Sequence, residues 1–241
     1  MQDSFQTLIR IFSLSFFLVL LGIQSGFAPI AQAGCRDAAE PGVDWKNCRK
    51  RNLILSGSDL KNSELARTDF SATDLRESDF SGANLHKSTL MRSTMAGSKA
   101  VKANFEHVMS YRTNFKNTDF TGASFNKAEL QRANFTGANL TDVSFVKADL
   151  GRAKFDNAIL ADNDFDRANL SRVDFRKAKI SGKLNVDSAF FLQTNIEGID
   201  FSIATNLEQW QLDMACGNDK TIVPEGLKIP EEWPCVPDKD E

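Results

Sequence analysis

The sequence has few of the residues that build metal sites and catalytic centres. Its 241 residues include four cysteines, two histidines and one tyrosine. No Cys-x-x-Cys pair is present, and the histidines lie far from the cysteines, which argues against a zinc site. No activated nucleophile, carboxylate pair or phosphate-binding loop accompanies them. We therefore predict no catalytic residue, no metal ligand and no cofactor, and a protein that is not an enzyme.

Long apolar runs are also scarce. The mostly apolar run Ile11–Ile23 is too short to span a bilayer, which takes about 20 apolar residues in a helix. Together with Arg10 before it and Ala31–Ala33 after it, the run is typical of a signal peptide over residues 1–33. We expect a mature chain that begins at Gly34 and has no transmembrane segment. An uncleaved anchor, or a lipid on Cys35, stays open as an alternative.

The dominant feature of the chain is a strict period of five between Arg51 and Ile180. Of 26 consecutive units of five, 24 carry Leu, Phe, Met or Ile at the same position, which we call the central position; Ala100 and Ser110 are the exceptions. A second column of small residues lies two positions earlier. Neither a helix nor a strand has this period, so the pattern indicates a solenoid whose units bury their apolar sides by stacking.

Residues 20 apart are also alike, which indicates four units of five in each turn. Phe105, Phe125, Phe145 and Phe165 share one column. On the outside, two neighbouring columns are basic. The first basic column contains Arg67, Lys87, His107, Lys127, Lys147 and Arg167, and the second basic column contains Arg92, Arg112, Arg132, Arg152 and Arg172. The two remaining columns in equivalent positions hold mostly Gly, Asn and Asp, such as Gly57, Asn117, Gly122 and Asp142.

Several units resemble the A(D/N)LXX motif of pentapeptide repeat proteins. They are Ser81–Leu85 (SGANL), Gln131–Phe135 (QRANF), Thr136–Leu140 (TGANL) and Val146–Leu150 (VKADL). This resemblance implies an all-β solenoid, the right-handed, four-sided (quadrilateral) β-helix of that family. It indicates the fold far more strongly than the function, because one fold serves many functions.

The segments at both ends are expected to close the coil. We predict an N-terminal cap over 34–50, with Trp45 and Val43 covering the first turn, a β-helix over 51–204, and a C-terminal cap and tail over 205–241. An insertion is expected within 181–187, where the period slips. Four cysteines in an exported chain indicate disulfides. Since the coil holds its ends more than about 30 Å apart, we expect the local pairs Cys35–Cys48 and Cys216–Cys235.

A short helix over 206–215 is expected to cover the last turn. Thr205–Glu208 matches a capping box, and Leu207, Trp210 and Met214 give the helix one apolar face. Gly217 is expected to end the helix, and Trp233 to pack beneath the tail. The ending also resembles, more loosely, exported pentapeptide repeat proteins of Gram-negative bacteria, which favours a periplasmic or secreted location.

The basic columns are the candidate binding residues. We assign possible anion binding to Lys87, Arg92, Arg112, Lys127, Arg132, Lys147, Arg152, Arg167 and Arg172. The alternative is that Glu129, Asp149 and Asp174 neutralise them and that their stems only cover the wall. A weaker candidate is the cluster of His86, Glu106, His107 and Tyr111, for which a solvated surface group beside irregular packing is the alternative.

Three classes of function compete. The first is a non-enzymatic scaffold outside the cytoplasm that presents rigid faces to a protein partner in the cell envelope, with dimerisation through its ends or faces as a possibility. The second is a rod that binds an anionic polymer. The third, a DNA mimic directed at gyrase, is implied by the family but disfavoured: residues 51–180 hold 20 Lys and Arg against 16 Asp and Glu, a net charge of +4. From Leu207 on the balance is 3 against 9, a net of −6. We expect no nucleic acid partner.

Overall fold

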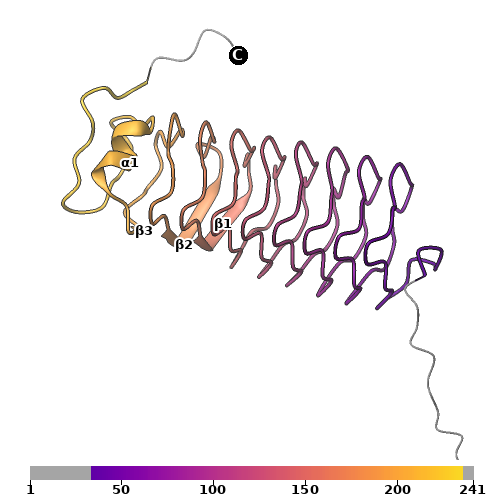
Figure 1. Ribbon diagram of the computed structural model, residues 1–241. Coiled ribbons are helices and arrows are strands. Elements are labelled where there is room, and N and C mark those ends of the chain that lie inside the picture. Colours follow the sequence, from indigo (N-terminus) through magenta and orange to yellow (C-terminus); the bar gives the residue numbers. More distant parts are fainter. Residues whose placement is uncertain (1–33, 236–241) are drawn as a thin grey trace, which may run out of the picture. The chain divides into compact units, whose positions relative to one another are not determined.

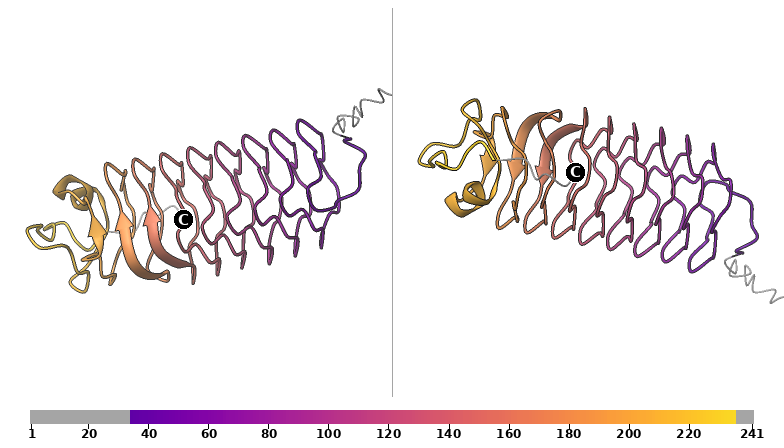
Figure 2. Two further views of the ribbon diagram at one scale, coloured as in Figure 1. Left: turned by 90° about the horizontal axis from the view of Figure 1, so that it is seen from below. Right: turned by 90° about the horizontal axis from the view of Figure 1, so that it is seen from above.

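The computed structural model describes residues 34–235, so the expected signal peptide (1–33) and residues 236–241 lie outside the described residues. From about residue 41 the chain winds into a coil with four sides per turn, and successive turns lie in a row (Figure 1). The same stack is seen from two other directions in Figure 2. Within the described range, no helix is both long and apolar enough to cross a membrane.

Backbone hydrogen bonds join each turn to the next. The first parallel bridge pairs Asp44 with Glu64, and the last pairs Asp200 with Ile222. Donor–acceptor distances between turns lie between 2.7 and 3.4 Å. Because almost all of these bridges join residues 20 or 21 apart, equivalent positions of successive turns stand above one another in columns.

Among residues 34–235, strands occur only where the bridges become continuous, towards the C-terminal end. Strands β1 (Ile159–Asp164), β2 (Lys179–Asn185) and β3 (Ala204–Thr205) form a parallel sheet in the order β1-β2-β3. Helix α1 (Gln209–Met214) follows β3. Elsewhere a bridge at each side alternates with a two-residue turn at each corner.

The central positions point inward, as the period predicts. Phe105, Phe125, Phe145 and Phe165 are each 1% exposed or less. Their rings stack face to face along the axis, with centroids 4.6 Å apart for the first pair and 5.2 Å for the last. The small residues two positions earlier are also buried, and several of their hydroxyls donate hydrogen bonds to backbone carbonyls. For example, Thr113 Oγ1 donates to the Leu90 carbonyl at 2.6 Å.

Each turn of the core holds a limited number of aromatic rings. Most turns between residues 61 and 180 place two Phe on opposite sides and aliphatic residues on the other two. The turn of Phe105, Phe115 and Phe120 holds three, and Phe120 lies edge-on to the other two at 5.4 and 5.2 Å. Ala100 and Ser110, both fully buried, stand where larger side chains would collide with these rings. The two exceptions to the period are therefore part of the packing.

The coil begins earlier than expected. Val43, Trp45, Cys48 and Lys50 are all buried, and bridges already join this segment to the next turn. The predicted separate cap over 34–50 is therefore largely the first turn itself. Trp45 occupies a central position, and the ammonium group of Lys50 lies 3.5 Å from its ring centroid. This turn was not predicted from the sequence, because a lysine at a central position is not typical of a buried core residue.

The irregularity expected within 181–187 is a single extra residue. In the pairing of β1 with β2, Ala161 lies opposite Ser181 and Asn163 lies opposite Leu184, so the register advances by one position between the two pairs. The extra residue falls beside Gly182, whose φ of +67° suits glycine. Beyond it the next sides stay aligned, with Asn169 opposite Phe190 and Asp174 opposite Asn195.

Helix α1 differs in its boundaries and its cap from the prediction. It begins at Gln209, and its capping box is formed by Glu208 and Gln211 instead of Thr205 and Glu208. Gln211 is fully buried, and its Nε2 donates to the carbonyls of Val186 (2.8 Å) and Ala189 (2.9 Å), which ties the helix to the coil beneath it. The helix ends at Met214, before Gly217.

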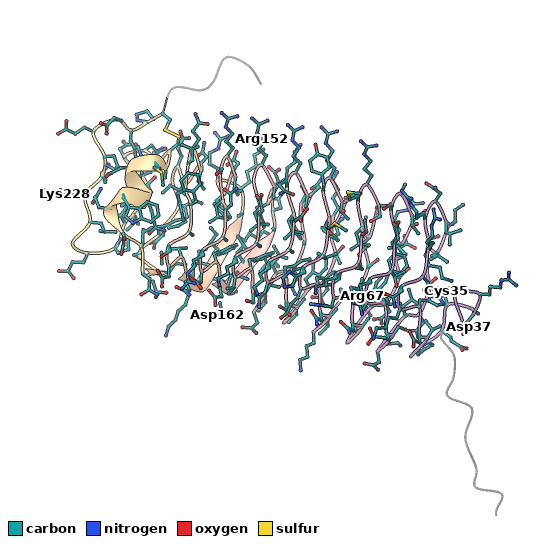
Figure 3. The ribbon with its side chains drawn as sticks, in the orientation of Figure 1. Cys35, Asp37, Arg67, Arg152, Asp162 and Lys228 are labelled. Atoms are coloured by element: carbon teal, nitrogen blue, oxygen red, sulfur yellow. A yellow bond between two sulfur atoms is a disulfide. The ribbon has the colours of Figure 1, made fainter. Side chains whose placement is uncertain are left out.

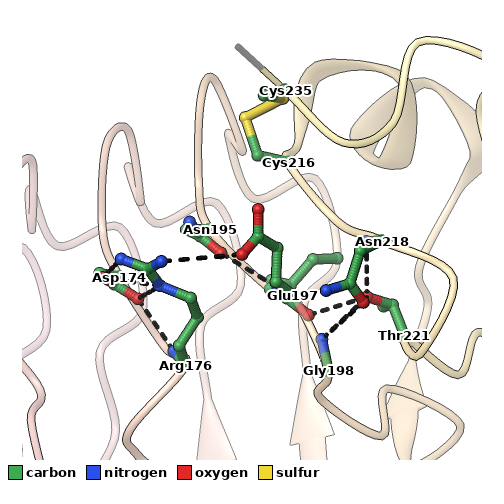
Figure 4. Close-up of polar contacts among 10 residues, drawn as sticks. Asp174, Arg176, Asn195, Glu197, Gly198, Cys216, Asn218, Thr221 and Cys235 are labelled. Carbon is green, nitrogen blue, oxygen red and sulfur yellow. Dashed lines mark hydrogen bonds and ion pairs between the residues drawn. A yellow bond between two sulfur atoms is a disulfide. The ribbon is translucent and has the colours of Figure 1, made fainter. Parts of the chain in front are cut away.

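Both disulfides are the local pairs that were predicted, Cys35–Cys48 and Cys216–Cys235. The second is drawn in Figure 4, above the polar contacts that join the last turns. Trp233 packs against Gly217, where a β-carbon would collide with the Trp233 ring, and Trp233 Nε1 donates to the Ala215 carbonyl at 2.8 Å. Each cross-link therefore ties one end segment to the adjacent turn.

We predict opposite effects for two substitutions at Ser110. Ser110→Leu restores the regular pattern but should lower the free energy of unfolding by about 1–3 kcal/mol, because Phe105, Phe115 and Phe120 already fill the space. Ser110→Ala should raise it by about 1 kcal/mol, because the buried hydroxyl has no partner among the described residues. Urea unfolding followed by circular dichroism measures both. A stabilising Ser110→Leu would show that the core there is not full.

Candidate functional site

The basic columns occupy the corners of the coil, where each member is the second of the two residues that turn the chain. Their backbone is left-handed: φ lies between 54° and 59° for all eleven residues. The other two columns of corners take the same conformation mostly with Gly, Asn or Asp, for which it is least unfavourable. A residue with a long side chain is disfavoured there by about 1 kcal/mol. The turn therefore does not explain the choice of Arg and Lys.

The side chains of both columns point into solvent. In Figure 3, Arg152 stands in a row of side chains that end in nitrogen along one edge of the coil. All members of the two columns are exposed except His107, which is partly buried. Neighbours within a column are one turn apart, or about 4.8 Å at the backbone. Like charges at this spacing repel unless an anion or solvent screens them.

The acidic residues expected to neutralise the columns have other partners or none. Asp174 binds Arg176, which lies outside both columns, at 2.7 Å (Figure 4). Asp149 accepts hydrogen bonds from Gln131 and Asn169. Glu129 makes no ion pair within residues 34–235. Seven of the nine candidate residues likewise make no ion pair with another described residue: Lys87, Arg92, Arg112, Lys127, Arg132, Lys147 and Arg152.

The two other candidate residues have polar partners. Arg167 lies 3.4 Å from Asp166, and Arg172 donates from Nε to Gln193 Oε1 at 2.6 Å. Both lie towards the C-terminal end of their columns. The positive charge without an acidic partner among residues 34–235 is therefore concentrated in the middle turns.

The weaker candidate cluster is only partly assembled. The rings of His86 and His107 meet edge to face, with centroids 5.4 Å apart. Glu106 lies beside them and accepts a hydrogen bond from Ser124 at 3.2 Å. The guanidinium carbon of Arg112 lies 5.2 Å from the ring centroid of Tyr111, so Tyr111 contacts the second basic column instead of the two histidines. Among residues 34–235 no group of three or more His, Cys, Asp or Glu is placed to hold a metal ion.

The pKa of His107 reflects the positive surroundings. Burial lowers this pKa, and Lys127, His86 and Lys87 lower it further, while Glu106 opposes them. The positive charges of the first basic column therefore disfavour another positive charge at His107.

The two columns border one side of the coil, which we call the intercolumn face. In each turn the chain passes from the first basic column to the second through two outward-facing positions. Bridges align one of these positions through Thr89, Met109, Glu129, Asp149, Asn169 and Phe190. The other is aligned by hydrogen bonds through Met91, Tyr111, Gln131, Gly151, Ser171 and Leu192. Sequence reasoning found the borders and missed this face, although the same spacing of 20 would have revealed it.

Two family models match the chain. One, described as a pentapeptide repeat region, covers residues 110–184, and the other, described as pentapeptide repeats in 8 copies, covers residues 54–90. The chain belongs to the pentapeptide repeat family. The four-sided coil described above is the quadrilateral β-helix of this family. Residues 91–109, between the two matches, contain Ala100 and lead into the turn with three Phe.

Solved structures of other pentapeptide repeat proteins are similar to this chain. HetL, a protein involved in heterocyst differentiation regulation in Nostoc sp. strain PCC 7120, is 22% identical over 79% of this chain and 92% of its own, with a TM-score of 0.36. QnrB1, a plasmid-mediated fluoroquinolone resistance protein, is 16% identical over 76% of this chain and 91% of its own, with a TM-score of 0.40. These values carry no argument about function. No curated protein matches the chain by sequence.

For this pentapeptide repeat protein we predict that the basic columns do not stabilise the coil. Arg132→Asn should leave the free energy of unfolding unchanged or raise it by up to about 1 kcal/mol, because Asn tolerates the left-handed backbone better. Arg132→Val should lower it by more than about 1 kcal/mol, because a β-branched residue is strained there. Chemical unfolding of both variants checks this. A loss above about 1 kcal/mol in Arg132→Asn would give the arginine a structural role.

Proposed function

We propose that this pentapeptide repeat protein is a non-enzymatic scaffold that presents a rigid face of its β-helix to a protein partner outside the cytoplasm. The observation that carries the proposal is the ladder of bridges from Asp44 to Ile222, which holds outward side chains in fixed columns. A surface fixed in this way loses little conformational entropy when a partner binds.

A location outside the cytoplasm is supported by the two disulfides and by the signal-like composition of residues 1–33. Disulfides persist in oxidising compartments such as the periplasm. Each of them closes a segment at an end of the coil, where exposed core and unpaired backbone would otherwise favour aggregation. In a Gram-negative cell the compartment would be the periplasm or the outside medium.

Isolation of the protein from the cell envelope tests this function. A C-terminally tagged full chain is cross-linked in cells, purified from the periplasmic and membrane fractions, and analysed by mass spectrometry. We expect a chain that begins at Gly34 and one polypeptide that co-purifies in near-stoichiometric amount. A chain found only in the cytoplasm with residues 1–33 intact would contradict the location. Purification of the monomer alone, with or without cross-linker, would contradict the scaffold function.

A second candidate function is the binding of an anionic polymer along the basic columns. Two observations favour it: the long basic residues occupy left-handed corners where they are disfavoured, and seven of them have no ion pair within residues 34–235. Phosphate or sulfate groups that follow the axis would lie near a positive charge in each turn. The mild positive charge of the coil also keeps the DNA-mimic function disfavoured, because that function needs an acidic surface.

Retention on immobilised heparin tests the second candidate. The wild-type protein should elute well above about 0.1 M salt, and the triple variant Arg112→Gln, Arg132→Gln, Arg152→Gln should not be retained. The control is the variant Lys99→Gln, Lys116→Gln, Lys154→Gln, which removes three exposed lysines outside both columns. Equal loss in both triple variants would mean that only net charge matters, and weak retention of the wild type would remove the candidate.

A further inference from the structure

Exposed apolar side chains gather on the intercolumn face. Between residues 60 and 200, five large apolar side chains are exposed, and four of them lie on this one side of the coil: Met91, Met109, Phe190 and Leu192. Their exposed fractions lie between 38% and 43%. Ile159 is the single exception within that range, on another side. Scattered apolar residues on a surface are ordinary, but their concentration between two rows of positive charge is not.

The apolar residues form two clusters. The first, with Met91, Met109 and Tyr111, lies near the middle of the coil, and the second, with Phe190 and Leu192, lies near its C-terminal end. Four bridges separate Met109 from Phe190, which places the clusters about 19 Å apart along the axis. About six residues of extended chain span the same distance.

The surface between the clusters is polar. It carries Gln131, Gly151 and Ser171 in one column and Glu129, Asp149 and Asn169 in the other. Asp149 is engaged in hydrogen bonds with Gln131 at 2.6 Å and Asn169 at 3.0 Å. Apart from Glu129, the middle of the face is therefore occupied by short or hydrogen-bonded side chains, and the Lys and Arg of the basic columns border it on both sides.

We propose that the intercolumn face binds an acidic, extended segment of a partner protein, whose apolar side chains contact the two clusters and whose carboxylates contact the basic columns. This inference rests on the proposed scaffold function and specifies the surface and the chemistry of the partner. Charge complementarity favours an acidic partner, since seven Lys and Arg residues of the borders make no ion pair with another residue among 34–235. The exposed Met and Phe require it to be apolar as well.

Two other kinds of partner fit this face less well. A sulfated or phosphorylated polymer would use the columns but gain nothing from Met109 or Phe190. An anionic membrane would need a continuous apolar surface, and here the polar residues between the two clusters, among them Glu129 and Asp149, interrupt it. An acidic segment with apolar side chains would contact both the charged borders and the two separated apolar clusters.

A pair of labelled peptides tests the proposal on the mature full-length protein. The first is a peptide of about nine residues with Phe at positions 2 and 8 and Glu elsewhere, so that both rings lie on one face about 20 Å apart. The second has Ser in place of both Phe and the same charge. Fluorescence anisotropy should show the Phe peptide binding at least about tenfold more tightly. Equal affinity of the two peptides would overturn the proposal.

Variants of the protein separate the two contributions. Met109→Ser with Phe190→Ser should abolish the preference for the Phe peptide and leave heparin retention unchanged. Arg112→Gln, Arg132→Gln and Arg152→Gln together should weaken both peptides. Met91→Ser with Leu192→Ser repeats the first test at the neighbouring positions if the first pair unfolds. A preference for the Phe peptide that survives both serine pairs would overturn the assignment of the clusters.

Two further outcomes distinguish this inference from the function on which it rests. Vesicles containing phosphatidylglycerol that bind the wild type, but not the Met109→Ser, Phe190→Ser variant, would identify a membrane as the partner and overturn the inference. A partner that co-purifies from the envelope equally with wild type and with both serine variants would preserve the scaffold function but place it on another face. Tighter binding of the Phe peptide, without any partner purified from the cell envelope, would support the intercolumn face as a binding surface and contradict the proposed scaffold function.

Discussion

The structure depends on the backbone hydrogen bonds that join each turn to the next. On each side of the coil, bridges join every turn to the equivalent residues of the next turn. The nearest neighbours of a side chain are therefore the equivalent residues one turn below and one turn above. A single substitution therefore acts within its column, whereas a property shared by a whole column becomes a surface or a core. The stacked Phe rings, the left-handed corners and the two basic columns are all results of this one repeat.

The core shows how strongly stacking restricts the sequence. Phe70 and Phe80 occupy one pair of opposite sides, and between Phe105 and Phe175 all the rings except that of Phe120 occupy the other pair. A change from one arrangement to the other brings three rings together in one turn, at Phe105, Phe115 and Phe120. Ala100 and Ser110 provide the volume for that change. A position that breaks the pattern of its own column thus satisfies the packing between columns.

Much of this fold could be predicted from the sequence because its period is unlike that of helices or strands. The two disulfide pairs and the place of the extra residue also followed, since a solenoid keeps its ends apart and a phase slip is visible in the central positions. The first turn was missed because Trp45 and Lys50 do not resemble repeat residues. The cap of α1 was misplaced because the buried Gln211 contacts Val186 and Ala189, which are distant in the sequence. Contacts of this kind follow from tertiary structure and leave no local signal.

The register across β2 determines how the surface can change in length. The coil accommodates one extra residue beside Gly182 while Asn169 still pairs with Phe190 and Asp174 with Asn195, so all four sides keep their orientation. Inserting a single unit of the repeat would instead advance every later residue by one side and carry the upper half of each basic column to a different side. Only a complete additional turn would lengthen the intercolumn face without breaking it. The length of the coil can therefore increase only in steps of about 4.8 Å, and the distance between its two apolar clusters can change only by such steps.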